Sequence, residues 1–337
     1  MFGSNKHKPA SKASKASKAS KFAAVDDNLV LSVFEFADIP DILSLSHVSK
    51  LFLKLAKEKA EGDLHPWYTP EEMKGILRLT PNITACCLFV ETIDSNYDLS
   101  FLQKTPPQEL RHLEIITSED VTFQLGFLGS LPKLRELIYD SAYVYHVTCD
   151  AISKATGLER LTLGTLDSLD GVDEVDAYID LDDDDAAHLS KLSKLRSLTI
   201  CSTTMAEMAF LVKLPSLEEF TLTGDKRKVA EKYHIGPDHL ANISKATSLK
   251  RLEIEFAYEF KDHIMYFESI VKMPNLEHLV LSGPLTSTFT PDILKLISTA
   301  PALRVIGGSI LKSISAPALT QYLPRVTYGE NGATSRS

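Results

Sequence analysis

The sequence predicts an α/β fold in which short parallel strands, each preceded by a helix, stack into a solenoid. An apolar pattern of the form Leu-x-x-Leu-x-Leu recurs nine times between residues 83 and 308. A similar helical stretch and turn come before each occurrence. Apolar residues make up 44% of the chain and charged residues 24%, which is the balance of a folded protein. Together these observations favour one long repeat domain with smaller additions.

The nine occurrences of the apolar pattern define the expected strands. Their starts lie 27, 24, 24, 37, 22, 32, 27 and 27 residues apart. The segments GSLPKL, VKLPSL, VKMPNL and STAPAL come before four of them, and SKATGL and SKATSL before two others. The patterns are Ile83/Cys86/Leu88, Leu110/Leu113/Ile115, Leu134/Leu137/Tyr139, Leu158/Leu161/Leu163, Leu195/Leu198/Ile200, Leu217/Phe220/Leu222, Leu249/Leu252/Ile254, Leu276/Leu279/Leu281 and a degenerate Leu303/Ile306/Gly308. Such self-similarity indicates a stacked array of repeats.

This pattern and period resemble those of leucine-rich repeats. The last two apolar residues of each pattern lie two apart on a strand and therefore enter the core together. The resemblance implies parallel strands on a concave face, with the helices outside. Side chains between the buried positions then point out of that face, where solenoids bind their partners. The candidate substrate-binding residues there are His112, Glu114, Glu136, Asp140, Arg160, Glu219, Arg251, Glu253, Glu255 and His278.

Composition and patterning divide the chain into four parts. We expect a disordered Lys/Ser/Ala-rich tail at 1–24, a small helical domain at 25–67, the repeats at 70–312, and a C-terminal cap and tail at 313–337. Within the second part, three short apolar faces have helical spacing, and Pro40 falls early in the second helix. So small a unit exposes more apolar surface than it can bury internally, so we expect it to need a partner.

Residues 27–56 resemble an F-box. The matching residues run LVLSVF from Leu29, IPDIL from Ile39, and VSKxFxxLA from Val48. The chain departs from the family at the start, where Val25-Asp26 stands in place of the usual Leu-Pro. With the repeats that follow, the chain resembles an F-box/leucine-rich-repeat protein over roughly residues 25–310.

The resemblance implies a non-catalytic adaptor of an SCF (cullin–RING) ubiquitin ligase. The F-box of that family docks the small linker subunit and, through it, the cullin, while the repeats hold a substrate protein. The residues expected to contact the linker subunit are Leu29, Val33, Ile39, Pro40, Ile42, Leu43, Val48 and Phe52. Two alternatives stay open: a repeat scaffold whose degenerate box engages no ligase, and a regulator of a small GTPase. The F-box-like helices and uneven periods disfavour the second.

The longest repeat, which starts at residue 158, carries an acidic insertion. Residues 167–185 contain ten Asp or Glu and no Lys or Arg. We expect an acidic loop there, either as a contact for a basic segment (of a substrate or of the chain's own tail) or as a solvated, mobile insertion. A calcium site is disfavoured because the run lacks the glycine and distal glutamate of an EF-hand loop. The residues singled out are Asp180, Asp182, Asp183, Asp184 and Asp185.

Charge and motifs exclude several other functions. The net charge is −9; because residues 1–22 contribute six lysines and no acid, residues 23–337 carry −15. An acidic body disfavours nucleic-acid binding. We expect no membrane span, no secretory signal, no metal and no cofactor, because no apolar run approaches about 18 residues and no catalytic or metal-binding motif occurs. Four sparse cysteines fit a cytoplasmic or nuclear protein with reduced thiols.

Overall fold

The computed structural model of the chain describes residues 74, 83–90, 100–117, 125–141, 143–144, 146–164, 178–181, 183–201, 204–205, 208–223, 236–255, 264–283, 290–309, 311 and 314–329. All of them belong to one compact unit, Ala60–Ser337. The predicted tail and the F-box-like unit, including all eight residues expected to contact the linker subunit, lie outside the described residues.

Ten strands form one parallel sheet in the described unit. Each strand pairs with the next repeat's strand, in the order β1-β2-β3-β5-β7-β9-β10-β11-β12-β13. The strands are β1 (Ala85–Val90), β2 (His112–Thr117), β3 (Glu136–Ser141), β5 (Arg160–Leu163), β7 (Ser197–Cys201), β9 (Glu219–Thr223), β10 (Arg251–Glu255), β11 (His278–Ser282), β12 (Val305–Gly307) and β13 (Thr327–Gly329). The predicted α/β solenoid of parallel strands is confirmed.

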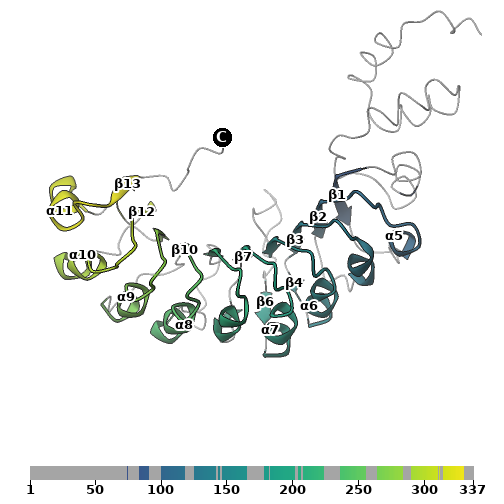
Figure 1. Ribbon diagram of the computed structural model, residues 1–337, viewed down its shortest axis with the longest axis horizontal. Coiled ribbons are helices and arrows are strands. Elements are labelled where there is room, and N and C mark those ends of the chain that lie inside the picture. Colours follow the sequence, from purple (N-terminus) through teal and green to yellow (C-terminus); the bar gives the residue numbers. More distant parts are fainter. Residues whose placement is uncertain are drawn as a thin grey trace, which may run out of the picture. The chain divides into compact units, whose positions relative to one another are not determined.

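Short helices connect the strands and cover one side of the sheet. Figure 1 shows the strands along one side of the unit and the helices along the other. The helices are α5 (Ser100–Lys104), η2 (Leu125–Ser130), α6 (His146–Ser153), α7 (Asp183–Leu189), η3 (Met208–Lys213), α8 (Pro237–Ile243), α9 (Ile264–Ile270), α10 (Pro291–Ile297) and α11 (Ala316–Tyr322). Among the described residues, no helix combines the length and apolar character that crossing a bilayer requires.

The core lies between the sheet and these helices, and the strand register stacks it in layers. Leu113 on β2 pairs with Leu137 on β3, which pairs with Leu161 on β5. These three side chains are at most 1% exposed. On β2 and β3 buried and half-exposed residues alternate strictly, as a strand with one covered face requires. The Leu-x-x-Leu-x-Leu pattern therefore identifies the core positions that hold neighbouring repeats together.

The sheet contains one strand more than the nine that the pattern predicts. The segment 313–337, expected to form a C-terminal cap and tail, contains α11 and β13, and β13 pairs with β12 in parallel. The apolar pattern is missing there, since Arg325 stands at the register position of Leu303. Its core-register residue Tyr328 is 41% exposed. The last repeat of such an array buries only the side that faces its neighbour, and its outer side can stay exposed.

Gly308 explains why the ninth apolar pattern looks degenerate. Its φ of +106° is a left-handed conformation that L side chains rarely adopt. A Cβ built there would overlap the carbonyl of Leu281 in the neighbouring repeat. The chain turns away at this point, and the Ser309 hydroxyl bridges Gly283, accepting from its N–H (3.0 Å) and donating to its carbonyl (3.1 Å). Glycine therefore replaces the third apolar residue because of its positive φ and the close approach of the Leu281 backbone.

A second, small sheet lies next to the acidic stretch. Strands β4 (Tyr143–Val144), β6 (Tyr178–Leu181) and β8 (Thr204–Met205) pair in parallel, in that order. Asp180 belongs to β6, and Asp183, Asp184 and Asp185 form the first turn of α7 instead of the expected loop. The helix dipole favours carboxylates in a first turn, which the charge count did not take into account. Asp182 lies outside the described residues.

Candidate interaction surface

The outward side chains of the ten strands form one continuous surface, which we call the strand face. The structure places all ten predicted substrate-binding residues on it, each half-exposed or exposed. They occupy matching register positions on neighbouring strands because the repeats stack without slippage. Two of the described outward side chains are buried, unlike the rest: Cys201 on β7 is 7% exposed and Val280 on β11 is 3% exposed.

The first row of the strand face is held by polar contacts between strands. Glu136 on β3 lies between His112 on β2 and Arg160 on β5 in register. Its Oε2 accepts a 2.7 Å hydrogen bond from Arg160 Nη2 and lies 3.2 Å from His112 Nδ1. The hydrogen bond from Arg160 holds the pKa of the Glu136 carboxyl below its usual value, although partial burial opposes this. Glu136 is therefore ionised at neutral pH and fixed in position.

Acidic residues lie on both sides of the central strand β7 of the strand face. Glu114 and Asp140 lie on β2 and β3, whereas Glu253 and Glu255 both lie on β10. Arg251 Nη2 donates to Glu253 at 2.9 Å. Asp140 and Glu255 share one register row, four strand steps apart.

In one row of the strand face, the strands between these acids carry hydroxyl groups. Thr162 on β5, Thr199 on β7 and Thr221 on β9 are neighbours in one row, and all three are half-exposed. Thr223 lies beside Cys201 in the next outward row. This part of the face offers hydroxyl donors and acceptors to a bound chain.

Three thiols near the strand face or core are held protonated. Burial raises the pKa of the Cys86 thiol to about 12. The pKa of Cys87 is also raised, first by partial burial and then by the nearby Glu114 carboxylate, with a smaller effect from Asp140. Burial is also the largest cause of the raised pKa of Cys201, and the carboxylates of Asp140 and Glu255 raise it further by smaller amounts. A protonated thiol is a poor nucleophile.

Sequence reasoning missed a ladder of alternating charges at the start of the strands, which we call the edge ladder. From β2 to β12, the residue just before each strand donates its backbone N–H to the carbonyl of the corresponding residue in the previous repeat, at 2.8 Å each time. From β3 to β12 these residues alternate in charge: Arg135, Glu159, Arg196, Glu218, Lys250, Glu277 and Arg304. Ion pairs join Arg135 to Glu159 (3.3 Å), Lys250 to Glu218 (3.2 Å) and Arg304 to Glu277 (3.8 Å). Aligning the residue after the first leucine of each apolar pattern would have revealed the alternation.

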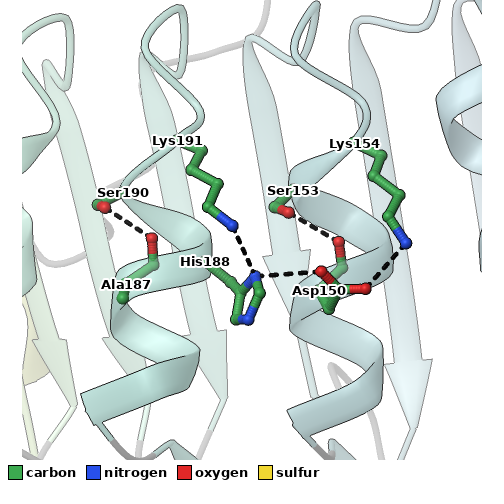
Figure 2. Close-up of polar contacts among 7 residues, drawn as sticks. All are labelled: Asp150, Ser153, Lys154, Ala187, His188, Ser190 and Lys191. Atoms are coloured by element: carbon green, nitrogen blue, oxygen red, sulfur yellow. Dashed lines mark hydrogen bonds and ion pairs between the residues drawn. The ribbon is translucent and has the colours of Figure 1, made fainter.

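The helix side carries a smaller polar cluster between α6 and α7. Figure 2 shows Asp150 of α6 between Lys154 of the same helix and His188 of α7. Lys154 Nζ donates to Asp150 at 2.8 Å and lowers the pKa of that carboxyl. His188 Nδ1 lies 3.3 Å from Asp150 and 3.0 Å from Lys191 Nζ. These contacts link neighbouring repeats across the helix side.

The acidic stretch contributes less exposed charge than its sequence suggests. Asp183 and Asp184 are exposed, but Asp185 is only 2% exposed and takes part in a polar interaction. No group of three or more His, Cys, Asp or Glu suited to hold a metal ion occurs in the part of the chain that the structure describes.

Comparison with known proteins finds similarity in structure only. No family model matches the sequence. No curated protein matches it either. Solved structures with a similar backbone include an internalin (inlF) from Listeria monocytogenes, at 15% identity and TM-score 0.39. The match covers 79% of this chain and 70% of the internalin chain. Human 5T4 (trophoblast glycoprotein) matches at 15% identity and TM-score 0.43, covering 73% of this chain and 83% of that one.

These solved structures are leucine-rich-repeat proteins. Their TM-scores lie below 0.5, so the fold assignment rests on the chain's own geometry. That geometry combines ten parallel strands in one sheet, helices on one side of it, and buried leucines at a recurring register. The described unit is an α/β leucine-rich-repeat solenoid.

Proposed function

We propose that this protein is a non-catalytic scaffold that binds another protein through its strand face. The observation that supports the proposal most directly is the surface itself: strands in fixed register present half-exposed polar side chains over many repeats. A solenoid of this kind is built to offer such an extended surface.

The test replaces two central residues of the strand face with bulky cations. Thr199 and Thr221 are register neighbours and half-exposed, so Thr199→Arg with Thr221→Arg changes the surface and leaves the core alone. Affinity purification of the full chain should lose partners in this variant. The matched control is Val212→Arg with Met265→Arg, at two exposed apolar side chains of η3 and α9. Equal capture by both variants would contradict the proposal.

A finer proposal is that the scaffold is the substrate receptor of an SCF ubiquitin ligase. It is supported by the resemblance of residues 27–56 to an F-box and by the repeats that follow. In this role the linker subunit and cullin would hold the protein, and the strand face would hold the substrate near the conjugating enzyme, raising its effective concentration there. We propose a cytoplasmic or nuclear location for this activity.

The two proposals differ in one measurable partner. Pro40→Ala with Ile42→Ala should abolish co-purification with the SCF linker subunit, while the strand-face partners are retained. The Thr199→Arg/Thr221→Arg variant should show the reverse pattern. If wild-type protein captures strand-face partners but no linker subunit, the scaffold stands without the ligase role.

A further inference from the structure

We propose that the strand face selects an extended basic segment of its partner, one that carries two cationic side chains about six or seven residues apart. The inference rests on the proposed protein-binding function and specifies the chemistry of the partner. It depends on how charge is distributed along the strand face.

Charge is segregated between the two parts of the described surface. Among residues 83–329 whose side chains are described, the strand face carries six acids and two arginines, a net charge of −4. The helices, turns and edges carry fifteen Lys or Arg and eleven Asp or Glu, a net charge of +4. A face with a net negative charge attracts a basic partner.

Within the strand face the negative charge forms two separate groups. The first acidic group is Glu114, Glu136 and Asp140 on β2 and β3, beside Arg160; the second is Glu219, Glu253 and Glu255 on β9 and β10, beside Arg251. Each group with its arginine therefore carries −2. Strand β7 between them presents only Ser197, Thr199 and Cys201 outward and carries no charge.

The fields of the two acidic groups overlap across the neutral strand. The Cys201 thiol on β7 has its pKa raised chiefly by burial, and Asp140 of the first group and Glu255 of the second add to that effect. Carboxylates on both sides thus act on one point of the face, so a bound segment would cross a negative potential between two minima.

The strand spacing sets the separation of the cations. Asp140 and Glu255 lie in one row, four strand steps apart. At about 4.8 Å per step this is roughly 19 Å, and the five steps from Glu114 to Glu253 give roughly 24 Å. An extended chain advances about 3.3 Å per residue, so six or seven residues cover this distance. The threonines between the groups supply hydroxyls for the backbone of such a segment.

The experiment selects peptides from a display library of random 12-residue sequences on the full chain. Enriched peptides should carry two Lys or Arg about six or seven residues apart. Their affinity should fall about tenfold on Glu114→Gln with Glu255→Gln, the scale expected for two partly exposed charge contacts. The matched control, Glu159→Gln with Glu277→Gln, removes two carboxylates from the edge ladder and should leave affinity within about twofold.

Each other result decides against one of the two claims. If the enriched peptides lack paired cations but still lose binding in the Thr199→Arg/Thr221→Arg variant, the inference fails and the protein-binding function stands. An equal loss in the strand-face and control variants also overturns the inference. If no enriched peptide is sensitive to Thr199→Arg/Thr221→Arg, the proposed function fails as well. Circular dichroism of each variant checks that the fold is intact.

Discussion

Glu136 on β3 accepts a 2.7 Å hydrogen bond from Arg160 on β5, and the bond joins two neighbouring repeats across the strand face. The Glu136 side chain is 27% exposed and that of Arg160 is 58% exposed. The pair is partly solvated, so its contribution to stability is modest and its main effect is to fix two charges in place.

Glu136→Gln should destabilise the protein at pH 7 by less than about 1 kcal/mol. The folded-state pKa of Glu136 is depressed, so its stabilising effect is present above the ordinary carboxyl pKa and is lost as the pH falls through the folded value. Urea unfolding of wild type and variant should therefore differ at pH 7 and converge in strong acid. A difference that grows on acidification would contradict this assignment.

Gly308→Ala should destabilise the C-terminal repeats by on the order of 3 kcal/mol, because the residue has positive φ and its Cβ would overlap the Leu281 carbonyl. Gly126→Ala is the matched control, since a Cβ there meets nothing within 4 Å. Thermal unfolding should show a large loss for the first variant and a change within about 1 kcal/mol for the second. Equal effects would mean that Gly308 is not constrained.

The repeat pattern predicted the core well because burial and strand register follow from the same spacing. Leu198 and Ile200 on β7 lie two apart and are at most 1% exposed. The pattern could not predict β13, because Arg325 stands where earlier repeats have leucine and Tyr328 holds the next core position. The tenth strand is defined by its pairing to β12 and not by its own sequence.

The acidic stretch was harder to predict because a charge count carries no information on local backbone structure. Asp183, Asp184 and Asp185 suit a helix N-terminus as well as they suit a loop. The burial of Asp185 depends on neighbours that belong to other elements of the fold. The edge ladder, in contrast, was present in the sequence at a fixed offset from each apolar pattern.

Glu218→Lys should destabilise the solenoid by about 1 kcal/mol at low ionic strength. The substitution breaks the 3.2 Å pair with Lys250 and places a cation between Lys250 and Arg196 in the edge ladder. Salt should reduce the cost because these charges are partly exposed. Glu268→Lys on α9, an exposed site away from the ladder, is the control. A cost equal to that of the control, or one unchanged by salt, would show that the alternation has no energetic effect.

Glu114→Gln should increase the alkylation rate of Cys87 several-fold at pH 8. The pKa of the Cys87 thiol is raised by partial burial and by the adjacent Glu114 carboxylate, so removing that charge lowers the pKa and increases the thiolate fraction, which is the reactive species. Site-resolved mass spectrometry after a timed iodoacetamide pulse gives the rate for each cysteine. Cys86 should stay unreactive in both proteins, because burial alone raises its pKa to about 12.

Glu253→Gln is the matched control for this measurement, since Glu253 lies on β10, six strand steps from the Cys87 strand. It should leave the Cys87 rate unchanged. If both substitutions accelerate Cys87 equally, the effect comes from the net charge of the strand face and not from the Glu114 contact. If neither does, burial alone sets the reactivity of this thiol, and the negative potential at the β1 and β2 end of the strand face is weaker than the division of charge implies.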